Sequence, residues 1–350
     1  MMRRVAASAA ILAVVGLAVM GRELYAPYAG YTGSQVLVIE PHMHTPAVAG
    51  LLVERGVLHH RWPFLIWYRL RRPRHTLKAG EYVFDRPLTP LEVYRKLEHG
   101  DVYFHSVVVP EGSDRFDIAR IVQQQLGMTP EEFLRVTQQA DLVHDFDDKA
   151  PTLEGYLFPD TYRFPRGVSA AAVATAMLSR FRRVLDSDLG RELRQSPHGL
   201  HGVMTLASLI EKETSDPAER SLVAGVFARR LKQRWPLQCD PTVVYAARLN
   251  HRFIGGSPEP ITRRDLKFDS AYNTYRHAGL PPGPICNPGE ASIRAAINPT
   301  SGKFLYFVSN NHGGHLFART LAEHQRNVAR YRRQVATFRR GTPESKRSAE

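Results

Sequence analysis

The stretch Leu206-Ala-Ser-Leu-Ile-Glu-Lys-Glu-Thr214 decides how the rest of the sequence is interpreted. Its apolar residues recur with the period of a helix, and two carboxylates stand where that helix ends. An apolar helix can carry an acid group to the edge of a packed core, where burial raises its pKa toward the value that suits a general acid. Most Glu-Lys-Glu runs are solvated helix faces, so this stretch alone does not establish catalysis.

The composition indicates a globular chain with anionic partners. Hydrophobic residues make up 43% and charged residues 23% of the 350 residues, which suffices for one large domain or two smaller ones. The net charge of +13 favours nucleic acid, an acidic membrane surface or an acidic polymer as partner. Neither zinc-finger spacing nor a basic run interleaved with aromatic residues accompanies this charge, so we predict no nucleic-acid partner.

An uncharged segment, residues 5–21, follows Arg3 and Arg4 and ends before Arg22. As a helix it spans about 25 Å, close to the lower limit for crossing a bilayer. We predict that residues 1–24 form a cytoplasmic N-terminus and a single transmembrane anchor, with the remaining chain outside by the positive-inside rule. The alternatives are a cleaved signal peptide, for which residues 19–23 offer a poor cleavage site, and a soluble enzyme that buries this helix.

We predict an α+β fold in which a linker at residues 25–34 leads to a small module at 35–103. A larger mixed α/β domain at 104–338 and a charged tail at 339–350 follow. The elements expected in the small module are a strand at 35–40, helices at 46–55 and 62–70, a strand at 78–84 and a helix at 90–97. Those expected in the large domain include a strand at 104–110, helices at 114–126, 170–185 and 218–232, a strand at 304–308 and a helix at 324–338.

The two carboxylates of the opening stretch, Glu211 and Glu213, do not share a face of the helix. Positions i and i+2 diverge by about 200°, so at most one of them enters a given pocket. Hydrolysis of a glycosidic bond usually needs a second acid across the bond. The candidates are Glu154, Asp160 and Asp240, each of which also suits a turn or a cap. A hydrolase with Asp240 or Asp160 as its base is therefore one function that the sequence allows.

Aromatic and histidine residues indicate chemistry less directly. Five aromatic residues stand in loop-like segments and suit either stacking on sugar rings or core packing: Tyr156, Phe158, Tyr162, Tyr272 and Tyr275. Histidine occurs in three close pairs: His42 with His44, His59 with His60, and His312 with His315. A metal site needs three or four converging ligands, and none of these spacings is that of a zinc-binding helix. We predict neither a metal nor a cofactor.

Several blocks of sequence together resemble the endolytic murein transglycosylase (YceG-like) family. The blocks are Glu154-Gly-Tyr-Leu-Phe-Pro-Asp-Thr-Tyr162, Ala207-Ser-Leu-Ile-Glu-Lys-Glu-Thr214, Val226-Phe-Ala-Arg-Arg-Leu231, Leu237-Gln-Cys-Asp-Pro-Thr-Val-Val-Tyr245, Tyr272-Asn-Thr-Tyr275, Gly279-Leu-Pro-Pro-Gly-Pro-Ile285, Asn287-Pro-Gly289, Ala295-Ala-Ile-Asn-Pro299, and Tyr306-Phe-Val308 with Gly314-His-Leu-Phe317. They occur in the family's order, and the uncharged N-terminal segment and the turn at residues 78–82 also fit.

The resemblance implies a lyase that cleaves the bond between MurNAc and GlcNAc inside nascent peptidoglycan strands. Cleavage leaves 1,6-anhydro-MurNAc ends and terminates strand elongation. The resemblance also implies that residues 35–103 are a LysM-like module and residues 104–338 a YceG-like catalytic domain. It implies a place in the cell inner membrane, with the catalytic domain in the periplasm and peptidoglycan synthases as partners.

The catalytic glutamate of this family is the second acid of its Glu-Lys-Glu motif, which is Glu213 here. A single acid suffices because the C6 hydroxyl of the sugar replaces both the water and a second carboxylate. The residues that the resemblance implies for substrate binding are Glu154, Asp160, Tyr162, Gln238, Asp240, Thr242, Asn273 and Tyr275.

The chain departs from the family pattern in two places. Glu40-Pro-His-Met-His-Thr-Pro46 stands where the family usually has a turn with glycine. Cys239 and Cys286 lie in blocks near the expected site, either as a bridge that stiffens the cleft or as two small buried residues. The alternative function is a non-catalytic scaffold that binds peptidoglycan at the inner membrane, against which the intact Glu-Lys-Glu motif argues.

Overall fold

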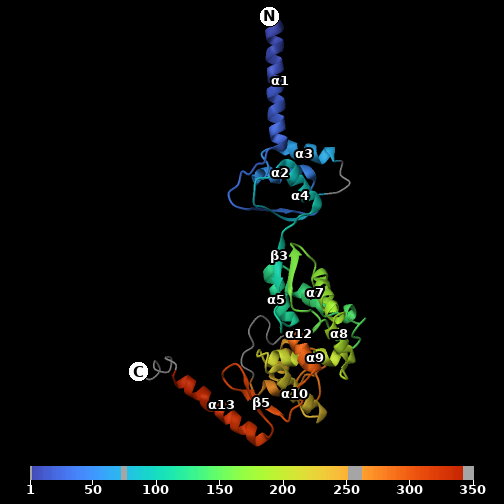
Figure 1. The fold of residues 1–350 in the computed structure, drawn as a ribbon, viewed down its shortest axis with the longest axis vertical. Helices are drawn as coiled ribbons and strands as arrows, with labels where there is room; N and C mark the ends of the chain where they lie inside the picture. Colours follow the sequence, from blue (N-terminus) through green and yellow to red (C-terminus); the bar gives the residue numbers. More distant parts are fainter. Residues whose placement is uncertain (1, 72–76, 251–261, 342–350) are drawn as a thin grey trace. The chain divides into compact units, whose positions relative to one another are not determined.

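The computed structural model describes residues 2–71, 77–250 and 262–341, and it describes side chains from residue 11 to residue 335 within these ranges. The chain divides into two compact units, whose elements are labelled in Figure 1. Unit 1 comprises Met1–Ser106 and Arg163–Val168, and unit 2 comprises Val107–Tyr162 and Ser169–Glu350. Each unit has buried hydrophobic residues of its own.

Unit 1 is built on a two-stranded antiparallel sheet in which β1 (Gln35–Ile39) pairs with β2 (Gly80–Phe84). Helices α2 (Thr45–Glu54) and α3 (Arg61–Leu70) connect the two strands, and α4 (Pro90–His99) follows. The largest fully buried side chains of its core are Leu52, Leu58, Phe64, Tyr82, Phe84, Tyr94 and Leu97. The predicted order of strand, helix, helix, strand and helix is confirmed.

The ends of α4 follow directly from its sequence. Thr89 accepts a hydrogen bond from the Glu92 N–H, and the Glu92 carboxylate accepts one from the Thr89 N–H, which forms a capping box. Gly100 closes the helix with φ 72°, a left-handed conformation that glycine adopts without steric cost.

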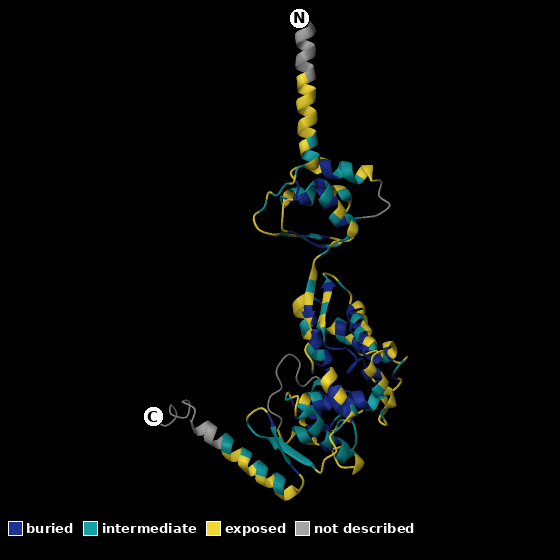
Figure 2. Cartoon of the chain, viewed as in Figure 1, coloured by how far each residue is buried: buried dark blue, intermediate teal, exposed yellow. Residues whose placement is uncertain are grey.

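The first helix, α1 (Met2–Tyr25), covers the segment for which the sequence predicts a membrane anchor. Large apolar side chains of this helix are exposed, as Figure 2 shows for its described part: Ile11 is 63% exposed and Leu12 72%. Residues 5–10 of the predicted span lie outside the residues whose side chains are described. Among the residues that the structure describes, no helix is long and apolar enough to cross a membrane, so the expected span is not found there.

Helices dominate unit 2. They are α5 (Arg115–Leu126), α6 (Pro130–Thr137), α7 (Ala170–Leu185), α8 (Asp188–Gln195), α9 (Gly199–Glu213), α10 (Arg220–Lys232), α11 (Asp240–Leu249), α12 (Glu290–Ile297) and α13 (Leu321–Gly341), with short 3-10 turns at Ala140–Leu142 and Asp265–Lys267. The hairpin of unit 2 is formed by β5 (Tyr306–Ser309), which pairs antiparallel with β6 (His315–Ala318). Strand β3 (Phe104–Val108) pairs with β4 (Thr161–Pro165), and each of these two strands has residues in both units. The fold is therefore α+β as predicted, and the large domain is more helical than the expected mixed α/β arrangement.

Helix α9 lies at the centre of unit 2, where it packs against α8, α10, α11 and α12. Every residue of 203–210 is buried, which explains why this segment carries no charged residue around its whole circumference. Its two buried hydroxyls return to the helix backbone: Thr205 donates to the His201 carbonyl at 2.8 Å, and Ser208 to the Thr205 carbonyl at 2.7 Å. The predicted helix of the opening stretch is confirmed, and its last residue is Glu213.

Candidate active site

Glu213 stands where the buried helix α9 ends beside a pocket of about 490 Å³. The helix stops because Thr214 is extended, with φ −141° and ψ 132°. The pocket is lined by Glu213, Arg230, Gln238, Asp240, Tyr275, Tyr306, Phe307, Val308, Ser309, His315, Leu321 and His324. These residues come from the ends of α9 and α10, the start of α11, a loop, the β5–β6 hairpin and α13. The fold thus brings two helix-borne carboxyls, that of Glu213 at the end of α9 and that of Asp240 at the start of α11, to a pocket that distant segments complete.

The carboxyl of Glu213 has the electrostatic setting of a general acid. Burial raises its pKa to about 7, and the nearby Asp240 carboxylate contributes to the rise. A hydrogen bond from the Cys239 thiol and electrostatic interactions with His315 and Arg230 act in the opposite direction. Near neutral pH this carboxyl is therefore present in both its protonated and its ionised form.

Glu211 has a different environment, as the angular separation of positions i and i+2 predicts. Its carboxylate accepts a hydrogen bond from the Gly289 N–H at 3.0 Å and lies 3.7 Å from the guanidinium of Arg220. The side chain is only 7% exposed. Glu211 therefore ties α9 to the start of α12 and to α10, whereas Glu213 faces the pocket.

Three residues of the predicted substrate-binding set surround the pocket with Glu213. The Tyr275 hydroxyl donates to Asp240 Oδ1 at 2.5 Å, which joins the loop after residue 270 to the first turn of α11. Gln238 adopts φ 51°, a left-handed conformation that costs energy for a residue with a side chain. Its N–H donates to the Thr274 carbonyl at 3.2 Å, which holds the strained segment against the same loop.

Thr242 and Asn273 lie beneath this wall rather than on it, since both are fully buried. The Thr242 hydroxyl bonds to the Cys239 carbonyl at 2.6 Å and to the Thr274 hydroxyl at 2.9 Å. The Asn273 amide donates to the carbonyls of Leu266 at 3.1 Å and Phe268 at 2.7 Å. Their hydrogen bonds shape the backbone that presents Gln238, Asp240 and Tyr275.

Glu154 belongs to a buried network of its own and is 1% exposed. Its carboxylate accepts hydrogen bonds from the Arg115 N–H at 3.1 Å, the Tyr245 hydroxyl at 3.0 Å and the Asn287 amide at 2.9 Å. Burial, with a contribution from the Asp114 carboxylate, raises its pKa to about 8. The structure thus joins Glu154 to α5, α11 and the loop before α12.

Asp160 and Tyr162, the other two predicted substrate-binding residues, lie near β4. Arg180 of α7 donates from Nε to the Asp160 carboxylate at 2.5 Å, and this hydrogen bond is the main cause that lowers the pKa of that carboxyl. The Tyr162 hydroxyl donates to the Phe158 carbonyl at 2.5 Å. The residues Glu154, Asp160 and Tyr162 of one sequence block therefore contact other parts of the protein than Glu213 does.

Two pocket residues to which sequence analysis assigns no role, Arg230 and His315, are held firmly in place. Arg230 is buried and donates to the Leu305 carbonyl at 2.8 Å and the Leu237 carbonyl at 2.6 Å. The Glu219 carboxylate bonds to both Nδ1 and the N–H of His315, each at 2.7 Å. The sequence signal for these two residues is their occurrence in the blocks at residues 226–231 and 314–317. That signal shows neither where their side chains point nor which residues they contact.

Cys239 and Cys286 are free, buried thiols, so the hypothesis of a bridge between them is wrong. Cys239 bonds to Glu213, whereas the Cys286 thiol donates to the Ser208 carbonyl at 3.3 Å. Burial raises the pKa of both thiols well above the ordinary value. The alternative interpretation, two small buried residues, fits these contacts.

The comparisons with known proteins agree on one family. A model of the YceG-like family matches residues 37–330. The chain is 30% identical over 296 residues to a Bacillus subtilis (strain 168) protein named endolytic murein transglycosylase, with 80% of each chain covered. It is 30% identical over 280 residues to a Streptococcus pneumoniae (strain D39) protein of the same name, which covers 72% of this chain and 50% of that protein.

A similar fold is also known from a crystal structure at 2.6 Å of a YceG-like protein from Listeria monocytogenes. The two chains superpose with a TM-score of 0.57 and 28% sequence identity. The superposition covers 84% of this chain and 98% of the Listeria chain.

Proposed function

This chain belongs to the YceG-like family, and we propose that it is an endolytic murein transglycosylase that cleaves the bond between MurNAc and GlcNAc within peptidoglycan strands. One observation carries the proposal. The carboxyl of Glu213 stands at the end of a buried helix in a pocket, with its pKa raised to about 7, whereas the other carboxyl that lines this pocket, Asp240, accepts a hydrogen bond from Tyr275. The curated relatives named as endolytic murein transglycosylases support the choice of substrate.

In the proposed reaction Glu213 acts first as an acid and then as a base. Its proton passes to the glycosidic oxygen as the bond to C1 of MurNAc breaks. The resulting carboxylate takes the proton of the C6 hydroxyl, whose oxygen bonds to C1 and closes the 1,6-anhydro ring. The attacking hydroxyl belongs to the same sugar, so neither water nor a second carboxylate is needed.

The glycan is proposed to lie against Gln238, Asp240 and Tyr275, which line the pocket with Glu213. Arg230 and His315 complete the wall on the other segments. The remaining residues predicted to bind substrate are proposed to support this wall or the core through the hydrogen bonds described for them: Glu154, Asp160, Tyr162, Thr242 and Asn273.

Mass spectrometry of purified peptidoglycan strands after digestion tests the proposal. Products with 1,6-anhydro-MurNAc ends are expected. Reducing ends would instead identify a hydrolase that activates water, and intact strands would identify the non-catalytic scaffold. Either of these two results overturns the proposed reaction.

The rate of strand cleavage is expected to fall as the pH rises through about 7. The proposed acid must begin the reaction protonated, and the pKa of Glu213 is raised to about 7. Above this value the protonated fraction decreases about tenfold for each pH unit. Initial rates between pH 5 and 9 measure the profile, and a rate that stays constant up to pH 9 would contradict the role of Glu213.

Asp240→Asn provides a matched test of the same profile. The Asp240 carboxylate contributes to the raised pKa of Glu213, so its removal is expected to move the fall in rate to lower pH. Tyr275→Phe serves as the control, because it removes the hydroxyl that bonds to Asp240 and leaves the negative charge in place.

We place the enzyme in the inner membrane, with residues 1–24 as its anchor, residues 25–34 as linker and the catalytic domain in the periplasm near peptidoglycan synthases. The exposed apolar side chains of α1, among them Ile11 and Leu12, support an apolar partner for this helix. Unit 1 is proposed to correspond to the LysM-like module, since β1, α2, α3 and β2 follow one another in it. Release of the protein from membranes by alkaline carbonate would contradict the anchor.

A further inference from the structure

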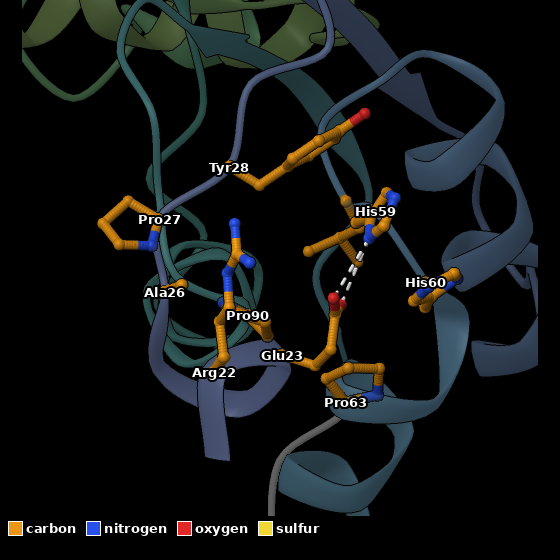
Figure 3. A pocket seen from close by; sticks show the side chains of 10 residues that line it. Arg22, Glu23, Ala26, Pro27, Tyr28, His59, His60, Pro63 and Pro90 are labelled. Atoms are coloured by element: carbon orange, nitrogen blue, oxygen red, sulfur yellow. Dashed lines mark hydrogen bonds and ion pairs between the residues drawn. The ribbon is translucent and has the colours of Figure 1, made fainter. Parts of the chain in front are cut away.

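A second pocket, of about 270 Å³, lies in unit 1 and takes no part in the proposed reaction (Figure 3). It is formed where the end of α1 meets the segment that precedes α3. Its lining residues are Arg22, Glu23, Ala26, Pro27, Tyr28, Leu58, His59, His60, Pro63 and Pro90. Three of them, Glu23, His59 and His60, carry side chains that can bind a metal ion.

These three side chains converge. One ligand atom of each side chain lies within 4.8 Å of a ligand atom of the other two. Among the described residues, this is the group of three possible metal ligands that lie so close together. His59 Nδ1 is 3.2 Å from one oxygen of the Glu23 carboxylate and 3.3 Å from the other. The rings of His59 and His60 lie with their centroids 4.1 Å apart. Figure 3 shows the Glu23 carboxylate and the His59 ring pointing toward one another.

The spacing of one pair, His59 with Glu23, is close to that of neighbouring ligands on a tetrahedral ion. Zinc binds His nitrogen and carboxylate oxygen at about 2.0–2.2 Å, which places two ligand atoms roughly 3.3–3.6 Å apart. His59 Nδ1 lies 3.2 and 3.3 Å from the two Glu23 oxygens, just below and at the short end of this range. We propose that Glu23, His59 and His60 bind a divalent transition metal ion, for which Zn²⁺ is the probe.

Donor type and exposure favour this occupant. Two imidazoles and one carboxylate suit zinc and its neighbours in the first transition row. The side chain of Glu23 is 20% exposed and that of His59 52%, so the ion can enter and water can complete its coordination. A metal ion would replace the contact between His59 and Glu23, and the neutral imidazole is the form that binds a metal. Arg22 lines the same pocket and weakens the attraction for a cation without removing a ligand.

The ion would fasten α1 to the rest of unit 1. Existing contacts there include the Trp67 indole N–H, which donates to the Leu24 carbonyl at 3.5 Å, and an edge-to-face contact of Tyr25 with Trp67. A bond network through Glu23 on α1 and the two histidines before α3 adds a stronger connection. Sequence analysis identifies the pair His59 and His60 but not the third ligand, because Glu23 lies on α1, 36 residues before His59.

Zinc titration of the purified full-length protein, made without a polyhistidine tag, tests the proposal. Calorimetry is expected to give one site per chain with a rise in melting temperature on binding. Each of Glu23→Gln, His59→Ala and His60→Ala is expected to weaken binding roughly tenfold or more, as loss of even an outer-shell partner can. The double variant His42→Ala with His44→Ala is the control for exposed histidines elsewhere in unit 1 and is expected to bind like the parent.

Arg22→Ala distinguishes a cation site from an anion site. A cation is expected to bind this variant at least as tightly as the parent, because a neighbouring positive charge is removed. Circular dichroism confirms that each variant is folded, and the visible spectrum of the Co²⁺ form reports the coordination directly. Equal zinc affinity in the parent and all three ligand variants would overturn the proposal. It would also be overturned if the parent binds inorganic phosphate at this site and the Arg22→Ala variant does not. None of these measurements involves glycan cleavage, so a failure of this proposal can be distinguished from a failure of the proposed function.

Discussion

Replacing Glu213 with glutamine is expected to abolish the formation of 1,6-anhydro-MurNAc ends. Glutamine fills the same space and retains hydrogen bonding, but it neither donates a proton to the glycosidic oxygen nor accepts one from the C6 hydroxyl. General acid–base catalysis typically contributes a factor of about 10²–10⁴, and Glu213 performs both steps, so a loss of about three orders of magnitude or more is expected. Mass spectrometry of digested peptidoglycan provides the measurement.

The same variant is expected to be more stable than the parent at pH 8 and about equally stable at pH 5. The folded-state pKa of Glu213 is raised to about 7, above the unfolded value, so the fold favours the protonated form. That stability is present at low pH and is lost as the pH rises through about 7, when a charge must form in a buried place. Urea unfolding at the two pH values measures the difference, and a variant less stable at pH 8 would contradict this electrostatic interpretation.

Glu211→Gln is the matched control on the same helix. The Glu211 carboxylate accepts a hydrogen bond from Gly289 and lies beside Arg220, outside the pocket that Glu213 faces. Its replacement is therefore expected to reduce stability and to preserve cleavage. Loss of cleavage in a folded Glu211→Gln protein, with full activity in Glu213→Gln, would reverse the assignment of the two acids.

Replacing Glu154 with alanine is expected to lower the free energy of unfolding by roughly 3–5 kcal/mol, since three buried donors lose an acceptor and each unsatisfied donor costs about 1–3 kcal/mol. The donors belong to Arg115, Tyr245 and Asn287. Urea unfolding at neutral pH checks the prediction. Glu154→Gln retains an acceptor oxygen and is expected to lose much less.

The outcome also decides between two roles for Glu154. The sequence predicts that it binds substrate, and the buried hydrogen bonds favour a structural role. If the alanine variant unfolds at an unchanged urea concentration while KM for the glycan strand rises, Glu154 contacts the substrate after all. A large loss of stability in Glu154→Ala, together with an unchanged KM in Glu154→Gln, supports the structural role.

Local sequence signals predict those parts of the fold that depend on local interactions. The capping box at Thr89 and the left-handed Gly100 define α4 from within a few residues. The apolar run before Glu211 predicts both the burial of α9 and its end near Glu213, because such a run is stable as a helix only inside a core. The divergent environments of the two acids follow from helical geometry alone.

Other elements depend on tertiary partners and escaped prediction. Strand β4 crosses an aromatic segment with prolines at both ends, and it exists because β3 pairs with it. Helices α8 and α12 have eight residues each, too few for a clear helical period. Arg230 and His315 enter the pocket only through the contacts of α10 with the loops and the β5–β6 hairpin. The sequence shows which side chains these two residues carry, but not where those side chains point.

The late position of the β5–β6 hairpin and α13 gives the pocket an order of assembly. A ribosome completes α9 and its acid well before it reaches Tyr306, His315 and His324, which line the same pocket. A growing chain therefore carries the proton donor before the hairpin and α13 have completed its pocket. A chain truncated before Tyr306 is therefore expected to keep Glu213 but to lack the residues of the hairpin and α13 that line its pocket.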